Sequence, residues 1–166
     1  MTESETLSPV LPPETEAATR RLLAKACDRD LLFATAESCT GGMLASLLTD
    51  LPGVAHAFER GFVTYTNEAK HEMLGVPMDV IEEKSAVSKE VAIAMAEGAL
   101  ERSRANITLS VTGYADSGEE SGLVHFGCAR AGRITAHREE HFGPIGRGPV
   151  RLECMRVAVE MMTDML

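Results

Sequence analysis

Positive charge, cysteine and long apolar runs are all scarce in this sequence of 166 residues. Lys and Arg number 16 against 25 Asp and Glu, which gives a net charge of -9. Neutralising nucleic-acid phosphates needs clustered Lys and Arg, so the acidic balance argues against a nucleic-acid partner. It leaves open a small anionic ligand, because such a ligand needs only a few local donors.

The scarcity of cysteine bears on the compartment. Cys27, Cys39, Cys128 and Cys154 lie far apart, and none forms a C-x-x-C pair. A secreted disulfide scaffold would be shorter and denser in cysteine, so reduced thiols packed as small apolar side chains are expected. No apolar stretch approaches the roughly 18 residues that span a membrane, and the acidic first residues are unlike a signal peptide. We therefore expect a cytoplasmic protein without a membrane partner.

The remaining composition is that of an ordinary globular protein. Apolar residues make up 45% and charged residues 25%, and the length suits one domain. Pro9, Pro12 and Pro13 predict a flexible tail over residues 1–13, followed by a single domain over 14–166.

Helical periodicity alternates along the chain with short apolar or β-branched segments. The segment 31–36 is almost continuously apolar, which is typical of a strand covered on both faces of a parallel sheet. Asn67 and Ser88 are placed to open helices, and Ala131-Gly132-Arg133 is a hairpin signal. The pattern predicts an α/β protein, a three-layer α/β/α sandwich with a mixed β-sheet. Helices are expected near 14–28, 42–50, 67–74, 88–103 and 148–166, and strands near 31–36, 62–65, 107–112, 123–129 and 134–141.

The strongest local signal is Ala36-Glu37-Ser38-Cys39-Thr40-Gly41-Gly42, where a buried strand turns into a helix. Adjacent glycines let the backbone approach a ligand, and free N–H groups at a helix start attract an anion or a developing oxyanion. This interpretation makes Ser38 a nucleophile. The same residues also suit a simple capped helix start with Ser38 or Thr40 as the N-cap. The spacing leaves both interpretations open.

A second cluster is Tyr65-Thr66-Asn67-Glu68-Ala69-Lys70, which joins a strand end to a helix. If the fold brings Tyr65 and Lys70 near Ser38, they can serve as its proton acceptor. Lysine can do so only where desolvation or a nearby cation lowers its pKa. An exposed strand-end tyrosine and an exposed helix lysine are the alternative.

Three further clusters have weaker signals. Arg147 and Arg151 are suited to gripping a phosphate, although two surface arginines fit equally well. The stretch His137-Arg138-Glu139-Glu140-His141 formally matches a zinc-protease motif, but that motif needs a helix and a strand is predicted here. A solvated strand face, and no metal site, is expected. The acidic loop 116–120 is interpreted as a solvated loop rather than a Mg²⁺ site.

Taken in the order in which they occur along the chain, these motifs resemble the C-terminal domain of the CinA family. That domain is the nicotinamide-nucleotide amidase or PncC-type module. The resemblance begins near residue 14 and extends over nearly all of the remaining chain, in the stand-alone form of the domain. The matching stretches are 36–42, 48–53, 61–70, 86–88, 95–99, 110–113 and 122–124.

The resemblance implies a three-layer α/β/α amidohydrolase that converts nicotinamide mononucleotide to nicotinate mononucleotide and ammonia, without metal or organic cofactor. Ser38 would be the nucleophile, and Tyr65 and Lys70 would activate it. The implied partner is a small pyridine nucleotide, and a homo-oligomer is compatible with a small enzyme of this kind. The residues implied to line the pocket are Glu37, Thr40, Gly41, Gly42, Asn67, Ser88, Thr112 and Gly113, with Arg147 near the ligand phosphate.

One stretch departs from the family pattern. After Thr-Gly the family usually continues with a glycine-rich loop and then a Lys-Pro. In this chain the corresponding loop, residues 113–122, is shorter than the family's loop and includes Asp116, Glu119 and Glu120. Carboxylates at this position would repel a phosphate that bare backbone N–H groups attract. The departure favours, as the alternative function, a pyridine-nucleotide-binding module without catalysis. A third hypothesis makes Cys39 the nucleophile, because a helix start lowers a thiol pKa.

Overall fold

A computed structural model describes residues 11–116 and 118–166. The strands form one five-stranded sheet in the order β2-β1-β3-β4-β5. The helices are α1 Pro13–Asp28, α2 Met43–Thr49, α3 Asn67–Leu74, α4 Met78–Lys84, α5 Lys89–Glu101 and α6 Arg147–Asp164, with a 3-10 turn at Ala55–Ala57. The strands are β1 Phe33–Glu37, β2 Phe58–Val63, β3 Ile107–Gly113, β4 Leu123–Arg130 and β5 Ala136–His141.

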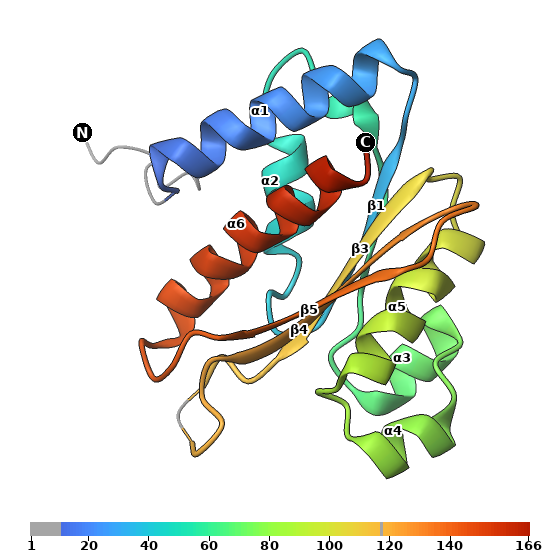
Figure 1. Ribbon diagram of the computed structural model, residues 1–166, viewed down its shortest axis with the longest axis vertical. Coiled ribbons are helices and arrows are strands. Elements are labelled where there is room, and N and C mark those ends of the chain that lie inside the picture. Colours follow the sequence, from blue (N-terminus) through green and yellow to red (C-terminus); the bar gives the residue numbers. More distant parts are fainter. Residues whose placement is uncertain (1–10, 117) are drawn as a thin grey trace.

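The sheet is mixed and lies between two layers of helices. β1 pairs in parallel with β2 and β3, whereas β3, β4 and β5 pair antiparallel. Helices α1, α2 and α6 cover one face, and α3, α4 and α5 cover the other (Figure 1). The predicted three-layer α/β/α fold with a mixed sheet is therefore confirmed.

Strand β3 shows how side-chain alternation joins the layers. Alternate residues, beginning with Ile107, lie in the apolar cluster under α1 and α6. The intervening Thr108 and Ser110 donate hydrogen bonds to the α5 carbonyls of Ala96 and Ala92, at 2.7 and 2.5 Å. Two residues of strand and one helical turn have similar lengths, so each hydroxyl meets a carbonyl. The small polar residues of the strand hold α5 against the sheet.

The helices on this face also approach one another closely. A Cβ atom on Gly98 of α5 would lie 1.9 Å from the carbonyl oxygen of Leu74, at the end of α3. No side chain fits in that space, so glycine allows the contact. This packing fixes the position of α3.

Several local predictions differ from the structure. β2 begins at Phe58 and ends at Val63, and because it is an edge strand its residues are only partly covered. Helix α4 was not predicted, since its seven residues are too few for a clear period. Thr66, not Asn67, caps α3, because its hydroxyl accepts the Ala69 N–H at 3.1 Å.

The predicted tail is described only at its end. Residues 1–10 lie outside the described residues, Leu11 is buried against the core, and Pro13 is the first residue of α1. The described end of that segment thus belongs to the fold.

Candidate active site

Ser38 follows β1 directly, at the carboxyl end of the central parallel strands. Its N–H donates to the Val111 carbonyl at 3.0 Å, and its own carbonyl accepts the Gly41 N–H at 3.1 Å. Gly41 and Gly42 have φ values of 61° and 96°, in the left-handed region that favours glycine. The two glycines let the chain turn from strand to helix immediately after the serine. Carboxyl ends of parallel strands are where α/β proteins bind ligands.

Lys70 of α3 lies beside this serine. Its Nζ is 3.1 Å from Ser38 Oγ, 3.1 Å from the Thr64 carbonyl oxygen and 3.3 Å from the Tyr65 carbonyl oxygen. The lysine side chain is almost wholly buried, at 1% exposure. Burial lowers the pKa of Lys70, and a negative charge on Cys39 opposes that shift. The interpretation of Lys70 as an exposed helix lysine is therefore wrong.

Lys70 Nζ donates to all three of its neighbours, the Ser38 hydroxyl and the carbonyls of Thr64 and Tyr65. A neutral amine has two N–H bonds and one lone pair, and the carbonyls of Thr64 and Tyr65 can only accept. Once the amine has lost a proton, it can therefore keep both carbonyl bonds and direct its lone pair at the Ser38 hydroxyl. Burial lowers the pKa of Lys70, which favours the neutral amine that a general base needs.

Tyr65 contributes to the pair through its backbone. Its side chain is 69% exposed and lines the pocket, and its carbonyl accepts from Lys70. Among the hydrogen bonds of the described residues, none joins the Tyr65 hydroxyl to Ser38. The structure brings the lysine to the serine, and the tyrosine carbonyl helps to hold the lysine there.

Glu37 is the last residue of β1 and has no exposed surface. Its carboxylate accepts hydrogen bonds from Thr40 Oγ1 at 2.7 Å, Leu44 N at 2.8 Å, Ala45 N at 3.0 Å and Thr35 Oγ1 at 3.3 Å. The carboxylate thus occupies the start of α2, where the sequence predicted a ligand anion. Glu37 and Thr40 support the turn from beneath rather than lining the pocket.

A pocket of about 780 Å³ opens above Ser38 and Lys70. A volume of this size is ordinary for a small-molecule site. The predicted residues that line it are Ser38, Tyr65, Lys70, Thr112, Gly113 and Arg147, whereas Glu37, Thr40, Gly41, Gly42, Asn67 and Ser88 do not.

Ser88 shows why some predicted lining residues lie elsewhere. Its hydroxyl accepts the Val91 N–H at 3.3 Å and donates to the Ser85 carbonyl at 2.9 Å, so it caps α5. Ala86 and Val87, which precede the cap, line the pocket instead. Sequence reasoning missed these two residues, and their position just before a helix cap was the available signal.

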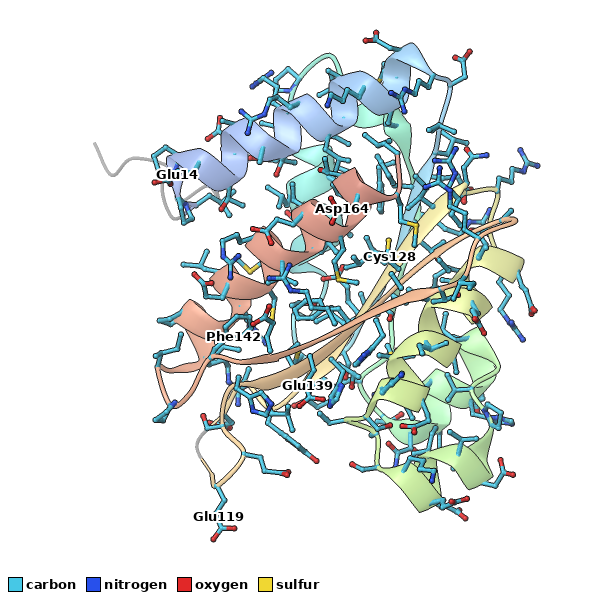
Figure 2. The ribbon with its side chains drawn as sticks, viewed as in Figure 1. Glu14, Glu119, Cys128, Glu139, Phe142 and Asp164 are labelled. Atoms are coloured by element: carbon cyan, nitrogen blue, oxygen red, sulfur yellow. The ribbon has the colours of Figure 1, made fainter. Side chains whose placement is uncertain are left out.

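Charges of both signs surround the pocket. Arg151 donates from Nε to the Cys39 carbonyl at 2.9 Å, and Arg147 pairs with Asp116 at 2.5 Å. Glu119, at the tip of the β3–β4 loop, extends away from the sheet (Figure 2), and it lines the pocket. The acidic loop predicted to oppose a phosphate therefore does border the site.

The histidines of β5 lie on a strand, as the sequence predicts. His141 Nε2 is 2.6 Å from Glu139, and His137 Nε2 is 3.0 Å from Nδ1 of His125 on β4. Figure 2 shows Glu139 on this strand. Within residues 11–116 and 118–166, no group of three or more His, Cys, Asp or Glu side chains is arranged to hold a metal ion.

Fold and site together define a three-layer α/β protein with a buried lysine against a serine, at the carboxyl end of a parallel strand. The sequence matches the CinA C-terminal domain over residues 15–166, so the chain belongs to that family. Among its described helices, none is long and apolar enough to cross a bilayer.

Individual relatives agree with this assignment. A CinA-like protein of Akkermansia muciniphila is 49% identical over 109 residues, which are 66% of this chain and 26% of that protein. The chain thus spans about a quarter of the length of that relative. The nicotinamide-nucleotide amidohydrolase PncC of Escherichia coli is 41% identical over 139 residues, 81% of this chain and 84% of the relative.

Solved structures extend the similarity to the fold. The competence/damage inducible protein CihA from Agrobacterium tumefaciens superposes with a TM-score of 0.88 at 42% identity, covering 92% of this chain and 95% of that one. A CinA superfamily protein from Escherichia coli has a TM-score of 0.78 at 36% identity, over 92% and 88% of the two chains.

Proposed function

We propose that the protein is an amidohydrolase that converts nicotinamide mononucleotide to nicotinate mononucleotide and ammonia. The observation that carries the proposal is the 3.1 Å contact between the buried Lys70 amine and the Ser38 hydroxyl, at the floor of a ligand-sized pocket. The name of the Escherichia coli relative supports this substrate class.

The proposed reaction begins with the lysine. Neutral Lys70 takes the proton from Ser38 as Oγ attacks the carboxamide carbon of the substrate. The Thr40–Gly42 turn is not assigned the oxyanion, because the Gly41 N–H bonds the Ser38 carbonyl and none of the three residues lines the pocket. Lys70 then returns the proton to the departing nitrogen, and ammonia leaves an acyl-enzyme. Water, deprotonated by Lys70, releases the nicotinate product and restores the serine.

Two arginines of the pocket support binding of the substrate phosphate. Arg147 and Arg151 both line the pocket, and Arg151 is anchored by its bond to the Cys39 carbonyl. The ion pair with Asp116 must open before Arg147 can engage a ligand. Guanidinium groups bind phosphate oxygens in pairs, which makes them suited to this role.

The acidic loop supports a second candidate function, a pyridine-nucleotide-binding module without turnover. Asp116 occupies Arg147, and Glu119 and Glu120 add negative charge to the pocket. Such a module would bind the nucleotide and gain thermal stability without releasing ammonia.

An ammonia-release assay with nicotinamide mononucleotide tests the proposal. We expect release by the wild type, loss to background in Ser38→Ala, and a wild-type rate in Ser46→Ala, an exposed serine of α2. Retention of the rate by Ser38→Ala overturns the serine mechanism, and its loss in Cys39→Ala alone would assign the nucleophile to the thiol. Thermal stabilisation without ammonia supports the binding module.

A further inference from the structure

Both tyrosines of the chain line the pocket above Ser38. The sequence contains two tyrosines and no tryptophan, and Tyr65 and Tyr114 both border this pocket. Their side chains are 69% and 38% exposed. An aromatic side chain stabilises a fold when it is buried, whereas these two leave much of their surface in a concave site. Two exposed rings in one pocket indicate a ligand that covers them.

The sheet places the two tyrosines on opposite sides of the serine. Tyr65 follows β2, Tyr114 follows β3, and Ser38 follows β1, which lies between those two strands. Neighbouring strands lie about 4.8 Å apart, so β2 and β3 are separated by about 10 Å. A gap of this width accommodates one flat ligand ring between two tyrosine rings, since stacked aromatic rings have centroids about 4.5–7 Å apart.

Tyr114 is held both at its backbone and at its hydroxyl. Its N–H donates to the Leu123 carbonyl at 2.9 Å and its carbonyl accepts the Gly122 N–H at 2.7 Å, so the residue closes the base of the β3–β4 loop. Its hydroxyl lies 3.4 Å from Oγ of Ser85, at the end of α4. The side chain therefore reaches from the end of β3 to the end of α4, and these contacts orient it before a ligand binds.

Ser85 itself has an unusual backbone conformation. Its φ of 77° and ψ of 151° lie in a region that glycine favours and that a serine adopts only where neighbouring contacts impose it. Here the Ser85 N–H donates to the Ile81 carbonyl at 3.0 Å, and the Ser85 carbonyl accepts the Ser88 hydroxyl at 2.9 Å. Strained residues gather at ligand sites, so the conformation of Ser85 supports the assignment of its neighbour Tyr114 to the site.

The charges beside the two rings favour a cation. Glu119 and Glu120 line the pocket next to the ion pair of Asp116 with Arg147. The face of a tyrosine ring is also negative and attracts a cation. A pyridinium ring is flat and positively charged, so it gains from both, whereas a dihydropyridine ring of the same size is neutral. Negative charge that opposes the phosphate of a substrate therefore favours its ring.

We propose that Tyr114 is a specificity-determining residue, which together with Tyr65 holds the substrate ring above Ser38 and selects the cationic pyridinium over the neutral, reduced ring. The inference rests on the proposed function, since it names the form of the substrate that the site accepts. Tyr114 belongs to the 113–122 stretch in which this chain departs from the family pattern, and the family resemblance assigns it no role.

Isothermal titration calorimetry in a Ser38→Ala background tests the selectivity without turnover. The two ligands are nicotinamide mononucleotide and its reduced 1,4-dihydro form, which share the carboxamide, the ribose and the phosphate. We expect the oxidised ligand to bind at least about fivefold more tightly. Tyr114→Leu should weaken binding of the oxidised ligand about five- to tenfold and of the reduced ligand less than about twofold.

Tyr114→Phe is the matched control, because it keeps the ring face and loses only the hydroxyl contact with Ser85. Its ratio of the two Kd values should stay within about twofold of the ratio in the Ser38→Ala parent. Equal weakening of both ligands by Tyr114→Leu, or no weakening of either, overturns the proposal. Loss of the selectivity in Tyr114→Phe overturns it as well, since the hydroxyl would then be the selective group.

Intrinsic fluorescence gives a second measurement that needs no change at Tyr114. Since the chain has no tryptophan and both of its tyrosines line the pocket, tyrosine emission reports on these two rings. In the Ser38→Ala protein, nicotinamide mononucleotide should quench this emission saturably, with the same Kd as in calorimetry. Quenching no greater than that of free N-acetyltyrosinamide in the same solution overturns the contact.

Turnover separates this inference from the proposed function. Ammonia release by the wild type, together with a Kd ratio that Tyr114→Leu leaves unchanged, refutes the ring selectivity and leaves the proposed function standing. Selective binding of the oxidised ligand through Tyr114, without ammonia release by the wild type, refutes the proposed function and leaves the ring selectivity standing.

Discussion

Replacing Glu37 by glutamine tests whether this buried carboxylate is a helix cap. Each carboxylate oxygen accepts one backbone N–H of α2 and one threonine hydroxyl. A glutamine amide has one oxygen, so its NH₂ group must face two donors whichever way it turns. One backbone N–H loses its acceptor, and the negative charge at the helix start is lost as well.

The cost follows from these contacts. An unsatisfied buried N–H costs about 1–3 kcal/mol, and losing a charge at a helix start costs about 1 kcal/mol more. We expect Glu37→Gln to lower the free energy of unfolding by about 2–4 kcal/mol, which lowers the Tm by about 4–16 °C at this chain length.

Urea unfolding followed by circular dichroism measures the effect, with Glu72→Gln as the control. Glu72 lies exposed on α3, outside its first turn, and should change stability by less than about 0.5 kcal/mol. If Glu37→Gln unfolds like the wild type with the same m-value, the capping argument is refuted. A raised KM at unchanged stability would show instead that Glu37 contacts the substrate.

Three further predictions concern packing, protonation and charge. Gly98→Ala should lower the free energy of unfolding in urea by about 1–3 kcal/mol, because the new Cβ would meet the Leu74 carbonyl. Gly148→Ala, where the Cβ would enter open space, should raise it by about 0.5–1 kcal/mol. Equal effects of the two substitutions would contradict the contact. In a pH profile for ammonia release, kcat/KM should rise with pH as Lys70 loses its proton. The midpoint should lie below the ordinary lysine pKa, because burial lowers the pKa of Lys70. A flat profile would exclude Lys70 as the base. Asp116→Asn should lower the KM for nicotinamide mononucleotide about fivefold by removing roughly 1 kcal/mol of repulsion, and an unchanged KM would place the phosphate elsewhere.

The order of strands and helices could be predicted because their periods are local. The apolar run of β1 and the alternation of β3 each reflect burial on defined faces, and both strands were found, although β1 begins at Phe33 rather than at residue 31. Helix α4 and the true start of β2 were missed, because a seven-residue helix and a half-exposed edge strand have weak patterns.

The candidate site, too, could be predicted from the sequence only in its local features. The sequence by itself determined the turn of Ser38, since two adjacent glycines are needed where the backbone has positive φ after a buried strand. Its motifs also indicated the family. Only the tertiary structure decided that Lys70 is buried against Ser38 and that Glu37 caps α2. The burial that lowers the pKa of the lysine exists only once the layers have packed.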